Sequence, residues 1–145
     1  MIDYVNQLLS EEEGRERCAY QDSRGYWSIG VGCLVDPRFA GAGLCDAAID
    51  AQLSHDSTAA LVTAMALPGW DRCNDVQKAV LVSMCFQLGD LRDWPDFKAH
   101  LALGDFPGAA AAGLDSIWYT QTPARARREM SMLSTGEWVP YGRTE

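Results

Sequence analysis

The sequence lacks long hydrophobic runs. Its longest apolar stretches, such as residues 79–86, fall far short of the ~18 residues that a membrane-spanning helix needs. No basic segment precedes an apolar one at the N-terminus, so we expect neither a membrane span nor an export signal. Apolar residues make up 48% of the 145 residues and charged residues 22%, which is typical of a folded chain. At this length we expect one compact domain, or two lobes that share a core.

Positive charge is also scarce, because 12 Lys and Arg residues face 20 Asp and Glu residues, for a net charge of −8. An acidic chain repels the phosphate backbone, which argues against a nucleic-acid partner. The five cysteines are odd in number and form no C-x-x-C pair, so neither a zinc site nor a complete disulfide framework is indicated. The two histidines do not form H-E-x-x-H, and neither a P-loop nor a G-x-S-x-G elbow occurs. We therefore expect free thiols.

The N-terminal third combines a helical segment with a β segment. Apolar residues at helical spacing predict a helix over residues 2–12. In residues 18–35, β-forming side chains flank the turn-rich tetrapeptide 22–25, which predicts an antiparallel hairpin or a three-stranded sheet. Gly30 and Gly32 within this segment indicate places where the backbone must bend or be approached closely.

The sequence pattern of the rest of the chain predicts helices. Residues 46–66 contain neither glycine nor proline and predict one helix about 31 Å long. Asn74 or Asp75 can cap the next helix, 76–88, which is apolar on nearly all sides and so predicts a core position. Thr122 followed by Pro123 predicts an N-cap hydroxyl and a helix start. The remaining helices are expected at residues 95–103, 106–112 and 123–133. The fold class is therefore α+β, mainly α, with a small N-terminal antiparallel sheet.

Two carboxylates are candidates for chemistry. Glu13 lies where the first helix ends, Asp22 lies at the hairpin turn, and Ser28 follows six positions later. Two carboxylates on either side of a bond are what glycoside hydrolysis requires. Burial would keep Glu13 protonated, while a polar turn would keep Asp22 ionised. The alternative is a solvated acidic helix end and an aspartate that only forms a turn, and the spacing by itself favours that alternative.

Three blocks of sequence change this balance. They are Glu13-Gly14 followed by residues 19–32, then residues 83–89, and then residues 118–128 running into 135–138. In this order they closely resemble the phage-type lysozymes, the muramidase endolysins of tailed bacteriophages. The resemblance covers almost the whole chain, with a shortened middle.

The resemblance implies a two-lobed lysozyme-like fold in a single domain, residues 1–145. The N-terminal lobe would span about 12–56, and the C-terminal lobe about 67–145 together with the helix 1–11. A long helix would connect the lobes, and the cleft between them would hold a peptidoglycan glycan strand. The implied reaction is hydrolysis of the β-1,4 bond between N-acetylmuramic acid and N-acetylglucosamine, with inversion, for host cell lysis.

The resemblance also assigns roles to residues. Glu13 matches the general acid, Asp22 the second carboxylate, and Ser28 the family threonine that helps to hold the attacking water. Residues implied to contact the substrate are Gly32, Leu34, Phe86, Gln87 and Arg125. Arg125 matches an arginine that reaches the catalytic glutamate from the larger lobe, and Phe86 fits a core role equally well. Trp118 and Trp138 are expected to be core aromatics rather than sugar platforms.

The implied protein is a monomer that needs no cofactor and no metal. It would be made in the host bacterial cytoplasm and act in the periplasm on the cell wall after release. Two departures from the family stand out: a negative net charge, where many lysozymes are basic, and Cys33, where the family usually has a histidine paired with an acidic residue that corresponds to Asp56.

Two other functions are alternatives to the lysozyme hypothesis. A lytic transglycosylase uses a single acid and yields an anhydro sugar, and Asp22 and Ser28 at the hydrolase spacing argue against it. A non-catalytic cell-wall-binding or virion structural module with a lysozyme fold would be signalled by loss of Glu13, which is present.

Overall fold

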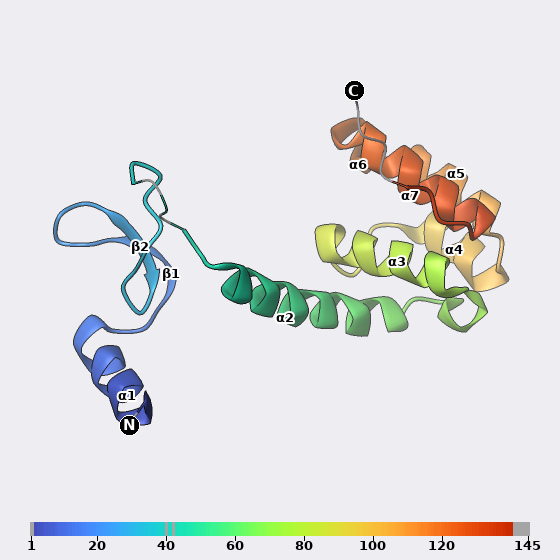
Figure 1. Ribbon diagram of the computed structural model, residues 1–145. Helices are drawn as coiled ribbons and strands as arrows, with labels where there is room; N and C mark the ends of the chain where they lie inside the picture. Colours follow the sequence, from blue (N-terminus) through green and yellow to red (C-terminus); the bar gives the residue numbers. More distant parts are fainter. Residues whose placement is uncertain (1, 40, 42, 141–145) are drawn as a thin grey trace. The chain divides into compact units, whose positions relative to one another are not determined.

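The computed structural model describes residues 2–39, 41 and 43–140, apart from the side chains of Asp3, Tyr4 and Glu13 (Figure 1). The chain divides into two compact units, Met1–Gln52 and Leu53–Glu145, which are described separately. The helices and the small antiparallel sheet confirm the predicted class, α+β and mainly α. The proposed grouping of the N-terminal helix with the C-terminal lobe stays a prediction.

The N-terminal unit holds one helix and the sheet, whose strands lie in the order β1-β2-β3. Its elements are α1 (Ile2–Glu13), β1 (Glu16–Gln21), β2 (Trp27–Gly30) and β3 (Cys33–Leu34). Ser28 pairs with Tyr20 on one side and with Leu34 on the other, so it lies on the central strand. Gly30 and Gly32 turn the chain from β2 into β3 with φ angles of 69° and 65°, which side-chain-bearing residues rarely adopt. The predicted bend at these glycines is confirmed.

Helix α2 (Asp46–Met65) is a single helix of 20 residues, as predicted, and the boundary between the units falls inside it. Its first turn carries Asp46, which suits the positive end of the helix dipole. Toward its end, Ala60 and Ala64 are buried. None of the helices that the structure describes is long and apolar enough to cross a membrane.

We call the second unit, Leu53–Glu145, the helical unit. After α2 it contains η1 (Trp70–Arg72), α3 (Asp75–Leu88), α4 (Pro95–Leu103), α5 (Phe106–Leu114), α6 (Ile117–Gln121) and α7 (Pro123–Thr135). Asn74 caps α3, as expected: its side chain accepts from the Gln77 N–H, and the Gln77 side chain accepts from the Asn74 N–H. The sequence did not predict η1 or α6, because segments of three and five residues are too short to show helical periodicity.

The start of α7 differs from its prediction in one respect. Pro123 is at the first helical position, as expected, but the Thr122 side chain does not cap the helix. Its hydroxyl donates to the Trp118 carbonyl, 3.1 Å away. Thr122 is also the C-cap of α6, so its N–H and its hydroxyl both donate to the Trp118 carbonyl at the end of that helix. The predicted N-cap hydroxyl is therefore wrong, while the predicted end of the helix near Gly136 is confirmed.

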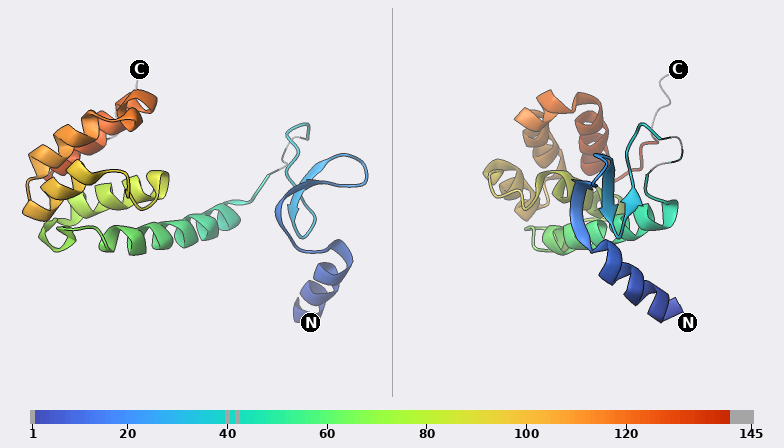
Figure 2. Two further views of the ribbon diagram at one scale, coloured as in Figure 1. Left: turned by 180° about the vertical axis from the view of Figure 1, so that it is seen from behind. Right: turned by 90° about the vertical axis from the view of Figure 1, so that its left-hand side faces the viewer.

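Helices α3, α4, α5 and α7 pack together in this unit (Figure 2), and its buried core draws residues from them and from α2 and α6. The largest buried side chains are apolar, among them Phe97, Leu81, Met84, Leu101, Met130 and Leu133. One buried polar side chain, Gln77, donates from its amide to the Leu133 carbonyl at 2.9 Å and so joins α3 to α7. The predicted core position of the third helix is confirmed.

Candidate active site

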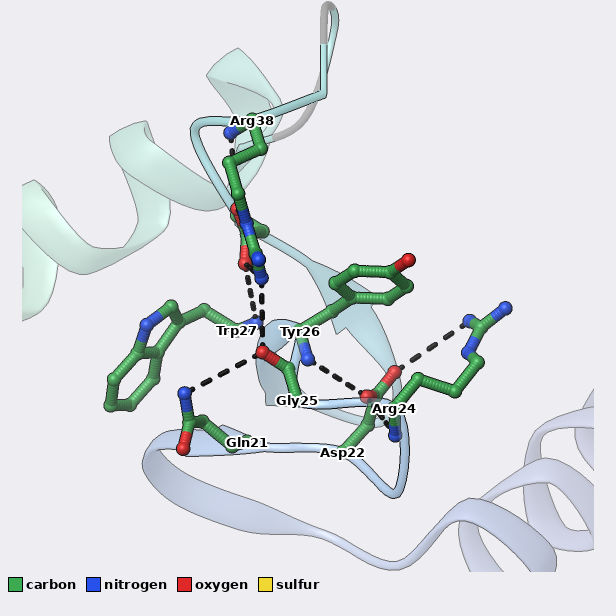
Figure 3. Close-up of polar contacts among 8 residues, drawn as sticks. Gln21, Asp22, Arg24, Gly25, Tyr26, Trp27 and Arg38 are labelled. Carbon is green, nitrogen blue, oxygen red and sulfur yellow. Dashed lines mark hydrogen bonds and ion pairs between the residues drawn. The ribbon is translucent and has the colours of Figure 1, made fainter.

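Asp22 lies in the turn between β1 and β2, and its own backbone closes that turn. Its N–H donates to the Tyr26 carbonyl, and its carbonyl accepts from the Gly25 N–H, both at 2.9 Å. The side-chain Oδ1 accepts from the N–H groups of Arg24 at 2.8 Å and of Tyr26 at 2.9 Å (Figure 3). Gly25 has a φ of 77°, which a residue with a Cβ would adopt only with strain. We call residues 22–26 the Asp22 turn.

The electrostatics of the Asp22 turn favour an ionised carboxylate. The hydrogen bond from the Tyr26 N–H, with smaller contributions from the Arg24 N–H and guanidinium, outweighs burial and holds the pKa of Asp22 below its usual value. The Arg24 Nη2 lies 3.6 Å from Asp22 Oδ2, and 24% of the Asp22 side chain is exposed. An ionised and oriented carboxylate that is open to solvent can act as a base or stabilise a positive charge.

Three further predicted residues lie in the same small sheet. Ser28 is buried on the central strand β2, which begins directly after the Asp22 turn. Leu34 is half-buried and pairs with Ser28, and Gly32 is exposed in the turn between β2 and β3. Asp22, Ser28, Gly32 and Leu34 therefore all belong to this small sheet or to its two turns.

Glu13 is the last residue of α1, as the sequence predicted. It lies three positions before the first strand residue, Glu16. The Glu13 side chain is outside the described part of the structure, so its role stays a prediction.

Phe86 and Gln87 lie near the end of α3 in the helical unit. Phe86 is 50% exposed and is not part of the hydrophobic core of that unit. Gln87 Oε1 accepts from the indole N–H of Trp118 at 2.9 Å. Because an indole only donates, this bond fixes which end of the Gln87 amide faces Trp118. Trp118 is 2% exposed, which confirms its expected core position.

A concave surface adjoins Trp118. It has a volume of about 480 Å³, and its lining includes Trp94, Asp96, Asp115, Trp118 and Gln121. Small-molecule sites are typically lined by apolar and aromatic side chains with a few polar groups, and this surface has that composition. The sequence did not predict it, because its lining comes from four helices and the loops between them.

Arg125 is held within the helical unit by α3 and α7. Its Nε donates to Glu129 Oε1 at 2.7 Å, and its Nη2 donates to Ser83 Oγ at 2.8 Å. Ser83 Oγ in turn donates to Glu129 Oε1 at 2.8 Å. Glu129 is buried, and its Oε2 has no hydrogen-bond partner among the residues that the structure describes. The predicted reach of Arg125 to Glu13 stays a prediction.

The sequence did not identify Ser83 and Glu129 as functional neighbours of Arg125. Glu129 stands four residues after Arg125 on one helix, a spacing that often places opposite charges side by side, and this was the available signal. The two other arginines of this segment have partners of their own: Arg127 donates to the Tyr119 hydroxyl, and Arg128 donates to the Val139 carbonyl.

Trp138 does not occupy the core position that the sequence suggested. It is 62% exposed, and the Arg128 guanidinium lies 5.1 Å from its ring centroid. A cation stacked on the ring replaces apolar packing there, because Trp138 follows the end of α7 and lies outside the helices that enclose the core.

The sequence also pointed to Cys33 and Asp56. The Cys33 thiol lies 3.7 Å from the Gly43 carbonyl in the N-terminal unit. Asp56 is on α2, where it is 3.0 Å from the ring of its neighbour His55. Among the described residues, no three His, Cys, Asp or Glu side chains form a cluster that could hold a metal ion.

A three-stranded sheet with a fixed carboxylate at its first turn, followed by a long helix and a helical unit, defines the lysozyme-like class of mainly α proteins. Comparison with known proteins agrees with this class. The phage lysozyme family matches residues 10–128, and the chain belongs to that family. The matched range contains the positions of Glu13, Asp22, Ser28 and Arg125.

Two curated relatives are distant in sequence. The chain is 25% identical to the pre-baseplate central spike protein Gp5 of Enterobacteria phage T4, over 94% of this chain and 28% of that protein. It is 23% identical to the probable T4-type lysozyme 1 of Dictyostelium discoideum, over 97% of this chain and 99% of that protein. The chain thus spans little more than a quarter of the first relative and nearly all of the second. Membership of the phage lysozyme family supports an activity of the lysozyme type, the hydrolysis of peptidoglycan.

Proposed function

We propose that this protein hydrolyses the β-1,4 bond between N-acetylmuramic acid and N-acetylglucosamine in peptidoglycan. The observation that carries the proposal is the Asp22 carboxylate, which backbone N–H groups orient and keep ionised. This carboxylate lies nine positions after Glu13 and directly before the strand that holds Ser28, all within the region matched by the phage lysozyme family.

In the proposed mechanism the two carboxyl groups have different tasks. Glu13 is the general acid and protonates the oxygen of the leaving sugar. Asp22 is the base toward the attacking water, and its negative charge stabilises the positive charge that develops on the sugar ring. The Ser28 hydroxyl helps to hold the water. Attack with inversion requires the carboxyl groups to be roughly 6.5 to 9.5 Å apart, so that a water fits between base and sugar.

Residues from both units bind the glycan strand in this proposal. Gly32 offers its backbone and Leu34 its side chain, and Arg125 supplies a positive charge. The half-exposed ring of Phe86 suits the apolar face of a sugar. The side-chain oxygen of Gln87 accepts a hydrogen bond from Trp118. Its amide nitrogen can therefore donate to a hydroxyl or N-acetyl oxygen of the glycan.

We further propose that the protein acts as a monomeric phage endolysin, made in the host cytoplasm and active on the cell wall after release. The phage lysozyme family supports this setting. The similarity to a central spike protein supports a second setting, in which the same activity belongs to a virion.

The nature of the soluble products tests the reaction. Purified peptidoglycan is digested with the protein, and the released fragments are analysed by mass spectrometry. Fragments that end in a reducing N-acetylmuramic acid are expected. Fragments that end in an anhydro sugar would instead indicate a lytic transglycosylase. Binding without any fragment would indicate a non-catalytic cell-wall-binding or virion structural module.

A further inference from the structure

An ion pair between a buried carboxylate, Asp36, and a partly exposed guanidinium, Arg38, lies beside the Asp22 turn. Asp36, two residues after β3, is 1% exposed, and its Oδ2 accepts from the Trp27 N–H at 3.0 Å. The Arg38 guanidinium binds the same carboxylate with both of its near nitrogens, Nε to Oδ1 at 2.7 Å and Nη2 to Oδ2 at 2.6 Å. The Arg38 N–H adds a third bond to Oδ1 at 3.0 Å. A two-point bond of this kind fixes the orientation of a guanidinium as well as its position.

From this anchor Arg38 reaches the Asp22 turn (Figure 3). Its Nη2 donates to the Gly25 carbonyl at 3.0 Å, and its guanidinium carbon lies 5.0 Å from the ring centroid of Tyr26. The Tyr26 N–H is one of the two donors that orient the Asp22 carboxylate. A continuous series of contacts therefore leads from Asp36 through Arg38 to the group that holds Asp22.

The ring of Tyr26 is held from other sides as well. Arg24 lies 5.1 Å from the ring centroid, and the edge of Phe39 packs at 4.8 Å. Both arginine side chains are partly exposed, Arg24 by 73% and Arg38 by 60%, but Arg24 pairs with Asp22 directly, whereas Arg38 contacts the backbone and the ring next to Asp22. The two arginines thus differ in how they act on the carboxylate.

We propose that Arg38, anchored by Asp36, is a positioning residue of the active site, which holds Gly25 and Tyr26 so that the Asp22 carboxylate keeps the orientation that hydrolysis needs. This inference rests on the proposed function of Asp22. Arg38 does not touch the reacting atoms in this account, and it acts through the Tyr26 N–H.

The charges around Asp22 define a signature of this role. The groups that face its carboxylate are Arg24 and the Tyr26 N–H, with Arg38 behind them paired to Asp36. The Asp22 charge is also a smaller cause of the raised pKa of Arg38, so the two charges interact. Loss of Arg38 loosens the Tyr26 bond and removes a nearby positive charge, and both changes raise the pKa of Asp22.

The test uses three variants of the full chain. Arg38→Met keeps an apolar stem but removes the charge and the donors, and Arg38→Lys restores a charge with one donor group. Arg92→Met is the matched control, because Arg92 also binds an aspartate two residues before it, Asp90, with Nε at 3.1 Å and Nη2 at 2.8 Å, but in the helical unit. The Asp22 carboxyl is titrated by carbon NMR, and kcat and KM are measured on soluble peptidoglycan fragments.

We expect Arg38→Met to raise the pKa of Asp22 and to lower kcat by up to about a hundredfold, with a smaller change in KM. Arg38→Lys should lie between this variant and the wild type, and Arg92→Met should match the wild type in both readouts. An unchanged Asp22 pKa and kcat in Arg38→Met would overturn the proposal, whatever happens to the melting temperature. If that variant does not fold, a wild-type Asp22 pKa and kcat in Arg38→Lys would overturn it, since a lysine cannot make the two-point bond.

The two proposals fail in different ways. If the wild type releases no fragments from peptidoglycan, the proposed function is wrong, and the Asp22 titration still tests whether Arg38 positions the carboxylate. If the wild type is active and Arg38→Met titrates and reacts like it, only the role of Arg38 is wrong.

Discussion

The two units of the chain are stabilised by different kinds of interaction. In the helical unit the largest buried side chains are apolar and lie on α3, α4 and α7 or between these helices. In the described part of the N-terminal unit, the two buried residues, Ser28 and Asp36, are both polar. Apolar packing is sensitive to volume, whereas hydrogen bonds and ion pairs are sensitive to donors, charge and pH. The unit that carries Asp22 is therefore the one whose geometry depends on polar contacts.

The largest expected loss of stability comes from the apolar core. Phe97, on α4, is 1% exposed, and Phe97→Ala should lower the free energy of unfolding by about 3 to 5 kcal/mol. Leu103→Ala on the same helix is the control, because Leu103 is 76% exposed and its loss should change stability by no more than about 0.5 kcal/mol. Denaturant unfolding measures both. Equal effects would show that this unit does not depend on the core described above.

The Arg125 and Glu129 pair is a polar exception within the helical unit. Arg125→Leu leaves the buried Glu129 carboxylate without its positively charged partner and should cost up to about 3 kcal/mol, because a buried charge without a counter-charge is poorly solvated. The double variant Arg125→Leu with Glu129→Leu removes both charges and should recover most of that loss. A double variant no more stable than the single one would show that the pair itself stabilises the unit.

Ser28 tests the polar interior of the N-terminal unit through activity. If its hydroxyl helps to hold the attacking water, Ser28→Ala should lose most of the activity on peptidoglycan, and Ser28→Thr should remain active. Ser28 is buried, so melting temperatures of both variants are needed to separate a folding defect from a catalytic one. Equal activity in the two variants would exclude a role for the hydroxyl.

The smallest effect concerns the pH dependence of the Asp36 pair. Bonds from the Arg38 side chain, and then from the Trp27 and Arg38 N–H groups, hold the pKa of Asp36 well below its usual value despite burial. A lowered folded pKa means that the ionised group stabilises the fold above the unfolded value of about 3.9, and that this stability is lost as the pH falls below it.

The difference in melting temperature between the wild type and Asp36→Asn should therefore be full at about pH 6 and shrink at about pH 2.5. Asp90→Asn is the matched control, since Asp90 pairs with an arginine in the same way but is exposed. A wild-type advantage over Asp36→Asn that is as large in acid as at neutral pH would contradict the assigned pairing.

Much of the fold could be predicted, because the signals are local. Helical periodicity located α1, α2 and α3, and turn residues located the hairpin. The turn-forming residues also predicted the position of Asp22, which the hydrogen bonds to its carboxylate confirm. These features depend on residues close together in sequence.

The features that were missed depend on contacts between segments. The sequence of residues 36–38 is typical of a charged loop. The hydrogen bond from Arg38 to the Gly25 carbonyl, 13 positions earlier, forms only in the folded sheet. Thr122 is a local exception: it directly follows α6, which is too short to show helical periodicity, and its hydroxyl bonds to Trp118 four residues earlier. Position along the chain alone could not indicate the contact between Arg38 and Gly25.

The central claim is that Glu13 is the proton donor for glycoside hydrolysis. Glu13→Gln removes the transferable proton and keeps the shape of the side chain, and Glu12→Gln makes the same substitution one residue earlier on α1. With melting temperatures like that of the wild type, Glu13→Gln should release peptidoglycan fragments roughly a hundredfold to ten-thousandfold more slowly, while Glu12→Gln should keep the wild-type rate. A Glu13→Gln protein as fast as the wild type would contradict the account.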